Sequence, residues 1–355
     1  MTRRSLRFAT PIAALVLLAF VPTFGFGLGS LLPGPLSSPG TLQLFAVCLI
    51  FAGVALSYDL LFGFTGLLSF GHALYFAAGA YVSDIAVTRW HWSFAAACLV
   101  TAAVGLVLPL VVGAISLRTS GIAFAMVTLA FAQAGAILVQ KNPRSWTGGD
   151  EGLGYDYTRV PAAFVGVFNT RNLYWLALGY AACVVAIVAW AVRSSPGRVW
   201  QAIRENERRI EVLGLRTRSY KLLAFVLGSF LATGGGVVYK LTVNGADPSV
   251  TTPDFTLTLL VMVVLGGTGT LWGPVIGGAL YWYANQRLIA VGGSHAIQSL
   301  PGVLRTPLSQ PLFVLGTLFI LAVFFLPGGL VGLGTRGRAG RAARGSTGPS
   351  VEEGA

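Results

Sequence analysis

Few residues of this sequence have the types and the spacing that catalysis requires. None of the three histidines belongs to a Ser/His/Asp arrangement or to an H-E-x-x-H motif, and no group of residues has the spacing of a metal site. The phosphate-binding pattern G-x-x-x-x-G-K-[S/T] is missing as well, so this chain cannot by itself hold the phosphates of ATP. We therefore expect no catalytic residue, no metal ligand and no cofactor in this chain.

Two titratable side chains in or beside long apolar runs are candidate functional residues. Asp84 lies inside such a run, where a carboxylate costs about 2.5 to 3.5 kcal/mol on insertion scales, so it is a candidate functional residue. Asp84 is only four residues from Thr88 at the end of this run, however, so its carboxylate could also reach the lipid headgroups on the external side. His72 follows Gly71 at an expected membrane boundary, where it could bind a proton or a substrate. A histidine that hydrogen-bonds a helix end is the alternative.

The long charged segment between the apolar runs extends from Arg193 to Lys221. It holds eight basic and three acidic residues, a third of the Lys and Arg of the chain in 29 residues. Ser195 is expected as the helix cap, Pro196 at the first helical position and Gly214 as a left-handed stop. The segment therefore contains a predicted helix of about 18 residues.

One narrow face of this helix is mostly apolar, with residues recurring at spacings of four and three: Val199, Ile203, Asn206, Ile210 and Leu213. Such a helix is expected to dock onto another surface. The alternative is a basic loop that fixes the topology or lies on anionic lipid. Acidic residues between the basic ones argue against lipid, because a lipid-binding face is usually uniformly basic: Glu205, Glu207 and Glu211.

The composition places these elements in a membrane. The chain is 55% apolar and 10% charged, against about 25% charged in soluble proteins, and its mean hydropathy is +0.74. The net charge of +12 would suit nucleic acid only on a soluble basic domain, which the sequence lacks. The three cysteines fall in apolar runs and are expected as small buried side chains without disulfides.

The apolar runs predict an all-α, polytopic membrane protein with about ten transmembrane helices, or eight if the two short runs do not cross. The predicted spans are residues 8–32, 41–61, 71–88, 94–117, 121–139, 172–192, 222–243, 255–265, 271–286 and 311–333. Residues 1–7 precede this transmembrane domain, 8–334, and residues 335–355 form a basic tail without apolar periodicity that we expect to be disordered.

The distribution of positive charge predicts the orientation. With both termini and the 193–221 loop in the cytoplasm, sixteen Lys and Arg residues fall inside and eight outside, which is the direction of the positive-inside rule. The 141–171 loop is then the largest external segment, and its Gly, Pro and Asp content favours an ordered cap.

Two glycine-rich segments resemble each other. We call residues 63–71, GFTGLLSFG, the first glycine turn and residues 266–273, GGTGTLWG, the second. Glycine-interrupted apolar segments in corresponding positions point to broken helices near a transport path, although chance is an alternative in a chain with 46 glycines. The translocation-path candidates are, with His72, the matching residues Gly63, Thr65, Gly66, Gly266, Thr268 and Gly269.

Five stretches together resemble one known family. They are TGLLSFGHALYFAAGAY from Thr65, LRTSGIAFAMVTLAFAQ from Leu117, TGGDEGL from Thr147, GRVWQAIRENERRIEVLG from Gly197 with YKLLAF after it, and VMVVLGGTGTLWGPVIGGALY from Val261. In this order they resemble the LivM-type permease subunit of branched-chain amino-acid ABC importers, over about residues 42–333. The two ends of the chain match nothing in that family. The alanine-rich coupling consensus of other ABC permeases is reduced to Glu211-x-x-Gly214.

The resemblance implies an ABC importer permease fold in the cell (inner or plasma) membrane and no enzymatic activity. It implies four kinds of partner: the bilayer, a second homologous permease of LivH type, two ATP-binding subunits that hold ATP and Mg²⁺, and an extracytoplasmic solute-binding protein. In such permeases the 193–221 loop lies in a groove of the ATP-binding subunit. The residues expected to couple there are Ile203, Glu205, Asn206, Ile210, Glu211, Leu213 and Gly214.

The expected solute is a branched-chain amino acid (leucine, isoleucine or valine) or a related amide such as urea. Two other classes remain open. A stand-alone secondary transporter or channel would need ion or proton ligands inside the spans, and a membrane-embedded enzyme would need a polar catalytic cluster at one depth.

Overall fold

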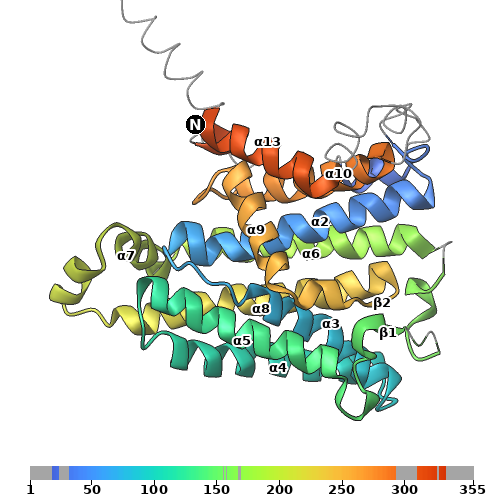
Figure 1. The fold of residues 1–355 in the computed structure, drawn as a ribbon, viewed down its shortest axis with the longest axis horizontal. Coiled ribbons are helices and arrows are strands. Elements are labelled where there is room, and N and C mark those ends of the chain that lie inside the picture. The colour runs from blue at the N-terminus through green and yellow to red at the C-terminus, as the bar shows by residue number, and fades with distance from the viewer. Residues whose placement is uncertain are drawn as a thin grey trace, which may run out of the picture.

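The computed structural model describes residues 18–23, 32–154, 156, 158–166, 169–292, 310–325 and 328–332. The N-terminal segment 1–7, most of the first predicted span and the tail 335–355 lie outside this part of the chain. Within it the protein is a bundle of α-helices, several of which run side by side along one direction (Figure 1).

Each of the other nine predicted spans corresponds to a helix, so the all-α class is confirmed. These helices are α2 (Pro39–Asp59), α3 (His72–Thr88), α4 (Phe94–Ser116), α5 (Gly121–Lys141), α6 (Thr170–Arg193), α8 (Thr217–Val243), α9 (Pro253–Gly266), α10 (Gly273–Gly292) and α13 (Pro311–Phe325). Six described segments are long and apolar enough to cross a bilayer: α2 with its π-helical end η3 (Leu60–Phe64), α4, α5, α6, α8 and the segment that begins with α13. The shorter α3 and α9 have 17 and 14 residues.

The remaining described elements are short or lie at the ends of the bundle. They are α7 (Ser195–Val212), the strands β1 (Leu153–Gly154) and β2 (Gly245–Ala246), and the 3₁₀ turns η1 (Val21–Thr23), η4 (Pro143–Ser145), η5 (Gly149–Glu151), η6 (Ala162–Phe164) and η8 (Pro248–Thr251). The two strands pair antiparallel and join the 141–171 loop to the end of α8.

Helix α2 forms the centre of the bundle. It is apolar on all sides, as a helix surrounded by protein must be, and 89% of its most apolar window is buried. It packs against α6, α8, α9 and α10. The ring of Phe51 stacks on Trp282 of α10 with centroids 4.2 Å apart. Side chains that reach the glycine turns from α2 are therefore held in a rigid position.

Helices α3 and α8 approach each other closely through glycines. A Cβ at Gly79 would clash with the backbone of Thr233, and a Cβ at Gly236 would clash with the backbone of Phe76. Small residues at helix crossings allow this approach in membranes, where van der Waals contact replaces the hydrophobic driving force between helices.

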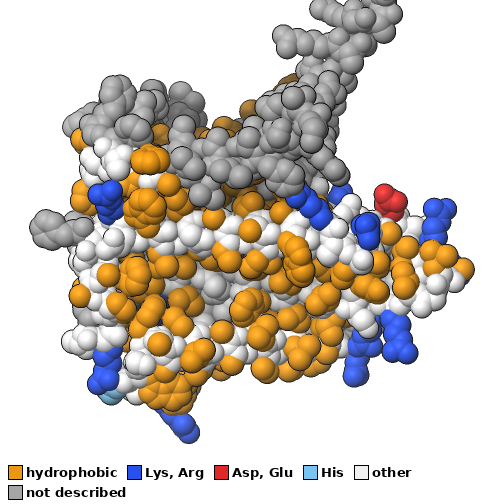
Figure 2. All heavy atoms as spheres, turned by 180° about the vertical axis from the view of Figure 1, so that it is seen from behind, with side chains coloured by type: hydrophobic (Ala, Val, Ile, Leu, Met, Phe, Trp, Pro, Cys, Tyr) orange, Lys and Arg blue, Asp and Glu red, His pale blue; other side chains and the backbone are white. Residues whose placement is uncertain are grey.

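The two ends of the bundle differ. Helix α7 lies at one end, and β1 and β2 lie at the other (Figure 1). Figure 2 shows hydrophobic side chains spread over the face between these ends, with Lys and Arg gathered toward them. This is the distribution expected of a protein that crosses a bilayer several times. The segments 141–171 and 193–221 therefore project from opposite ends of the helices, as the predicted topology requires.

One prediction about the cysteines needs correction. The thiol of Cys48 is buried and Cys98 is half-buried, but Cys183 is exposed on α6. An apolar helix surface faces lipid as readily as protein, so an apolar run in the sequence does not distinguish the two.

Candidate coupling site

Helix α7 begins one residue earlier than predicted. The hydroxyl of Ser194, and not that of Ser195, accepts the backbone N–H of Gly197 at 3.4 Å, and Pro196 is the second helical residue. Gly197 is buried against the end of α6, where an added Cβ would clash with the carbonyl groups of Ala191 and Val192. The chain therefore turns sharply from α6 into α7, whose 18 residues have the predicted length.

Asn206 divides α7 into two segments. Its backbone is extended, with φ −160° and ψ 97°, and its side-chain oxygen accepts the N–H of Arg209 at 3.0 Å. Asparagine at this position thus caps the second segment in the way that it caps a helix start. Asn206 was predicted on the apolar face of one continuous helix, and the structure gives it this capping position instead.

The end of α7 is the predicted glycine stop. Gly214 has φ +83° and donates its N–H to the carbonyl of Glu211 at 2.9 Å, and Leu215 donates to Ile210 at 3.3 Å. These two bonds are the pair that closes a helix whose next residue is left-handed. Glycine adopts that conformation without the steric cost that a Cβ brings.

The apolar face of α7 is largely used within this chain. Trp200, Ile203 and Ile210 are 1%, 4% and 8% exposed. The Trp200 indole donates to the carbonyl of Tyr220 at 2.8 Å, which fixes the first segment to α8. In this conformation Ile203 and Ile210 are covered by the chain itself. The residues of the predicted apolar face that remain available to a partner are the exposed ones.

The exposed part of the face lies at the far end of α7. Val212, Leu213 and Leu215 are 83%, 70% and 38% exposed, and the arginines at 208, 209 and 216 beside them are exposed too. An apolar tip among arginines is suited to a partner with an apolar groove and an acidic rim.

The acidic residues of α7 have different surroundings. Glu207 pairs with Lys221 of α8 at 2.5 Å. Glu211 accepts the hydroxyl of Thr217 at 3.0 Å. Glu205 is exposed. Both segments of α7 are therefore connected to α8, the first through the Trp200 indole and the second through carboxylates.

The two glycine turns meet next to α7. Asp59, at the end of α2 and 0% exposed, accepts the N–H of Gly269 with both carboxylate oxygens, at 3.0 and 3.1 Å. A Cβ at Gly63 would clash with the Asp59 carboxylate and with Gly269. Gly66 and Gly269 have φ +75° and +71°, which favours glycine. These two similar segments, 203 residues apart in sequence from Gly63 to Gly266, therefore lie in contact.

Arg204 of α7 reaches both turns. Its guanidinium donates to the carbonyl of Gly63, and its charge interacts with the Asp59 carboxylate. A Cβ at Gly66 would lie 3.3 Å from the Arg204 side chain, and one at Gly269 would lie 2.5 Å from its guanidinium. The sequence did not distinguish Arg204 from its basic neighbours, because an exposed arginine in a charged loop has no periodicity or motif of its own.

The other path candidates have structural contacts. Thr65 donates its hydroxyl to the carbonyl of Leu60 at 2.8 Å. Thr268 is half-buried in the second turn. A Cβ at Gly266 would clash with the backbone of Gly273, so glycine at these two positions allows the close hairpin between α9 and α10.

His72, which the sequence predicts at a membrane boundary, is buried inside the bundle. It is 0% exposed, its Nε2 is 3.0 Å from the hydroxyl of Ser57, and its ring packs edge-on against Tyr58 and Tyr75 with centroids 5.2 and 6.5 Å away. Among the described residues, no hydrogen-bond partner faces its Nδ1 or the hydroxyls of the two tyrosines.

The segment that precedes His72 is non-helical and lies inside the protein. The N–H of Phe70 binds the Thr128 hydroxyl of α5 at 3.1 Å, and the N–H of Ala73 binds the Thr256 hydroxyl of α9 at 3.0 Å. Side chains thus satisfy backbone groups that a continuous helix would pair itself. Irregular backbone at membrane depth is tolerated where protein surrounds it, and it is typical of helices that are broken at a transport site.

Asp84, the other titratable candidate, belongs to a buried ion pair. Its carboxylate is 3.4 Å from the ammonium of Lys240, and both side chains are 0% exposed. Lys240 is buried within α8, three residues before its end. A single lysine near the end of an apolar run gives no sign of whether it points outward or into the bundle.

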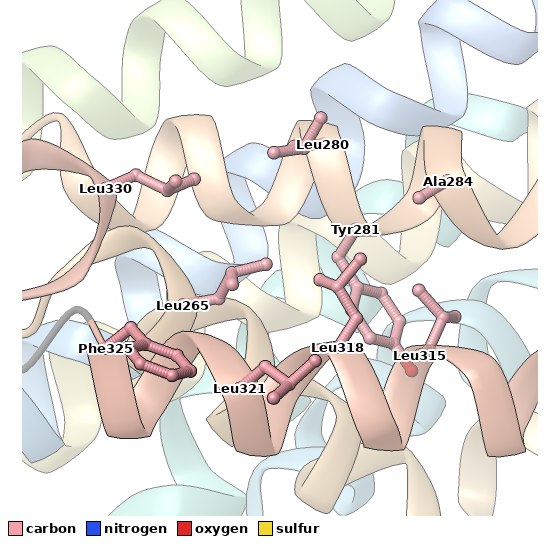
Figure 3. A pocket seen from close by; sticks show the side chains of 9 residues that line it. All are labelled: Leu265, Leu280, Tyr281, Ala284, Leu315, Leu318, Leu321, Phe325 and Leu330. Atoms are coloured by element: carbon pink, nitrogen blue, oxygen red, sulfur yellow. The ribbon is translucent and has the colours of Figure 1, made fainter.

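The bundle also contains an apolar groove between α9, α10 and α13, with a volume of about 400 Å³ (Figure 3). Its lining is aliphatic and aromatic: Leu265, Leu280, Tyr281, Ala284, Leu315, Leu318, Leu321, Phe325 and Leu330. No lining side chain carries a charge, so this groove cannot neutralise an ionic solute and is not the expected solute site.

Comparisons with known proteins identify the family. A family described as "Branched-chain amino acid transport system / permease component" matches residues 40–323. The chain is 25% identical over 320 residues to the high-affinity branched-chain amino acid transport system permease protein LivM of Escherichia coli K12, covering 83% of this chain and 70% of that protein.

Other known proteins resemble the chain in part. A probable LivM of Methanocaldococcus jannaschii is 28% identical over 48% of this chain and 49% of its own length. The autoinducer 2 import system permease protein LsrC of Escherichia coli O9:H4 is 29% identical over 52% of this chain and 51% of its own length. Among solved structures, a chain of PsaBC from Streptococcus pneumoniae in complex with Fab aligns with a TM-score of 0.42 and 13% identity, over 81% of this chain and 91% of that chain. That similarity is too low to bear on the fold.

The family match covers well over half of the chain, and the described helices supply the membrane spans that a permease needs. The chain therefore belongs to the family of branched-chain amino acid transport system permease components, and it is a multi-pass membrane permease subunit of LivM type, not an enzyme.

Proposed function

We propose that this chain is the permease subunit of an ATP-driven importer of branched-chain amino acids. It forms the translocation pathway with a second permease of LivH type. Two separate ATP-binding subunits supply the energy, and an extracytoplasmic binding protein delivers leucine, isoleucine or valine. The likeness to LivM over 83% of the chain supports this solute class.

The attachment of α7 to the transmembrane helices is the observation that carries the proposal. Helix α7 lies at one end of the bundle, presents Leu213 and its exposed neighbours outward, and contacts both glycine turns through Arg204. A force applied to the exposed end of α7 therefore has a route into broken, glycine-rich segments that are expected near the pathway. The sequence has no phosphate-binding loop, so the ATP that drives such a force belongs to a partner.

The proposal includes an orientation. Helix α7 and both termini face the cytoplasm, where ATP is available, and the 141–171 loop faces outside. In that loop Asn142 accepts hydrogen bonds from the backbone of Thr147 and Gly148 at 2.9 and 3.1 Å, and β1 pairs with β2. These bonds order the segment on which a binding protein would dock.

A second solute class has support in the similarity to LsrC, a permease of an autoinducer 2 import system. A urea or short-amide permease is the other alternative. The same membrane subunit could serve any of these solutes, because in this class the binding protein selects the solute.

The experiment is uptake of radiolabelled leucine into proteoliposomes that contain the full complex, with ATP enclosed on the side of the ATP-binding subunits. Excess unlabelled isoleucine and valine should suppress uptake, and urea and autoinducer 2 should leave it unchanged. Suppression by urea or autoinducer 2 alone would assign the chain to that alternative, and uptake that is independent of ATP would contradict the importer itself.

A further inference from the structure

We propose that Arg204 and Asp59 form a link that transmits the movement of α7 to both glycine turns, with Arg204 as the positioning residue. This inference rests on the proposed ATP-driven import. It adds which side chains carry the force and where the force enters the transmembrane part.

Two kinds of contact attach α7 to the rest of the protein. Trp200, Glu207 and Glu211 connect the helix to Tyr220, Lys221 and Thr217, which lie in α8. Of the hydrogen bonds that α7 side chains make in the described parts of the chain, that of Arg204 is the one that reaches a glycine turn. The α8 contacts hold α7 in place, whereas Arg204 connects it to segments from elsewhere in the sequence.

The buried carboxylate of Asp59 makes this link sensitive to the position of Arg204. The Asp59 carboxylate is buried at the end of α2, and a buried charge is costly unless hydrogen bonds and an opposite charge compensate it. Here the N–H of Gly269 and, at longer range than an ion pair, the charge of Arg204 offset part of that cost. If α7 moved and carried Arg204 away, the carboxylate would lose its cation and the Gly63 carbonyl would lose its donor. The two turns would then have to rearrange together.

The glycine turns pack closely against Asp59 and Arg204, so small shifts of the turns have little room to absorb a movement of Arg204. Added Cβ atoms at Gly63 and Gly269 would collide with the link, and Gly66 packs against the Arg204 side chain. Closely packed interfaces switch between discrete arrangements and do not deform continuously. A displacement of Arg204 is therefore passed on to the turns.

Substitutions that remove one charge test the link in the assembled complex. Arg204→Gln removes the cation, and Asp59→Asn keeps an oxygen that can accept the N–H of Gly269. Arg204→Lys keeps the charge without the planar guanidinium. Arg198→Gln is the matched control, because Arg198 is an exposed arginine of the same helix that lies outside the exposed apolar tip. The measurement is solute imported per ATP hydrolysed, together with the yield of assembled complex.

We expect Arg204→Gln and Asp59→Asn to lower the solute imported per ATP about tenfold, within the usual range of coupling between sites. ATP hydrolysis and assembly should stay near the parent level. Arg204→Lys should recover part of the loss, and Arg198→Gln should behave as the parent. Parent coupling in both test variants would overturn the link. A parallel loss of assembly, hydrolysis and import would also overturn it, because that is the result of a purely structural contact.

A second readout does not depend on whether these variants assemble. In a background without native cysteines, Thr268→Cys places a thiol in the second turn, and its rate of reaction with a water-soluble maleimide is compared between nucleotide-free and ATP-trapped complexes. The link predicts a changed rate, and an unchanged rate would contradict it. If the parent complex showed no ATP-driven import at all, the proposed function would be wrong. If the parent complex imported solute and Arg204→Gln imported as much per ATP, the proposed function would stand and the link would be wrong.

Discussion

At the scale of single residues, the buried ion pair between Asp84 and Lys240 shows how this bundle accommodates charge. Both side chains are 0% exposed, and they connect α3 to α8 at 3.4 Å. Sequence reasoning found Asp84 because a carboxylate in an apolar run is conspicuous. It missed Lys240 because a lysine near a helix end can extend its side chain to the membrane surface. Only the three-dimensional packing shows that the two meet.

The first prediction concerns this pair. Lys240→Met leaves the Asp84 carboxylate buried without its cation, and breaking a buried pair on one side costs about 3 to 5 kcal/mol. We expect a clear fall in the thermal stability of the detergent-solubilised protein, measured by size-exclusion chromatography after heating. The double variant Asp84→Asn with Lys240→Met removes both charges and should recover much of the loss. If the double variant is no more stable than the single one, the pair is not what holds these helices.

The second prediction separates the buried from the exposed part of α7. Ile203→Ala removes a buried side chain and should cost about 2 to 5 kcal/mol of packing within this chain. Leu213→Ala, at a side chain that is 70% exposed, should leave the stability of the isolated subunit nearly unchanged. It should weaken association with the ATP-binding subunit by about 2 kcal/mol if Leu213 is central to the contact.

The measurement for the second prediction is the affinity of the purified ATP-binding subunit for each variant in lipid nanodiscs. Leu110→Ala is the matched control, because Leu110 is an equally truncated, exposed leucine on the apolar surface of α4. If the ATP-binding subunit bound Leu213→Ala and Leu110→Ala with equal affinity, the end of α7 would not be part of the interface.

At the scale of elements, the ends of α7 could be predicted and its interior could not. The serine-proline start and the glycine stop are local signals, so the prediction was within one residue at the start and correct at Gly214. The break at Asn206 has no comparable signal, because asparagine is also an acceptable helical residue on a charged surface. The similarity of the glycine turns is visible in the sequence, but their close contact and the residues that join them, Asp59 and Arg204, were identified only in the structure.

The third prediction tests the glycine stop. Gly214→Ala forces a Cβ into a left-handed conformation, which costs about 1 to 2 kcal/mol, and should change the angle at which the chain enters α8. We expect lower import per ATP hydrolysed with normal membrane insertion. Gly214→Asn should be milder, since asparagine tolerates this conformation. Equal defects in the two variants would mean that the side chain itself, and not the backbone conformation, is responsible.

At the scale of the whole molecule, the helices followed from the sequence because apolar runs of this length form helices in a bilayer. Six of the nine predicted spans agree with their helices to within two residues at each end, as for 94–117 and α4 or 172–192 and α6. What could not be predicted is which faces of these helices touch. The sequence of α2 is as apolar as that of α5, yet α2 is largely buried and α5 is largely exposed, because the difference arises from the partners that surround each helix.

The fourth prediction concerns orientation. In a background without native cysteines, Asp150→Cys in the 141–171 loop and Glu205→Cys in α7 are both exposed sites. An impermeant maleimide added to intact cells or right-side-out vesicles should label Asp150→Cys and miss Glu205→Cys until the membrane is opened. The reverse labelling pattern would contradict the cytoplasmic position of α7.

The central claim is that this subunit moves solute only when ATP-binding partners act on it. The most direct measurement is the rate of leucine entry into proteoliposomes that contain either the purified chain alone or the assembled complex, with and without enclosed ATP. We predict entry for the complex with ATP, and background entry for the complex without ATP and for the chain alone. Rapid entry of leucine down its gradient through the chain alone, at a rate typical of carriers, would contradict the account.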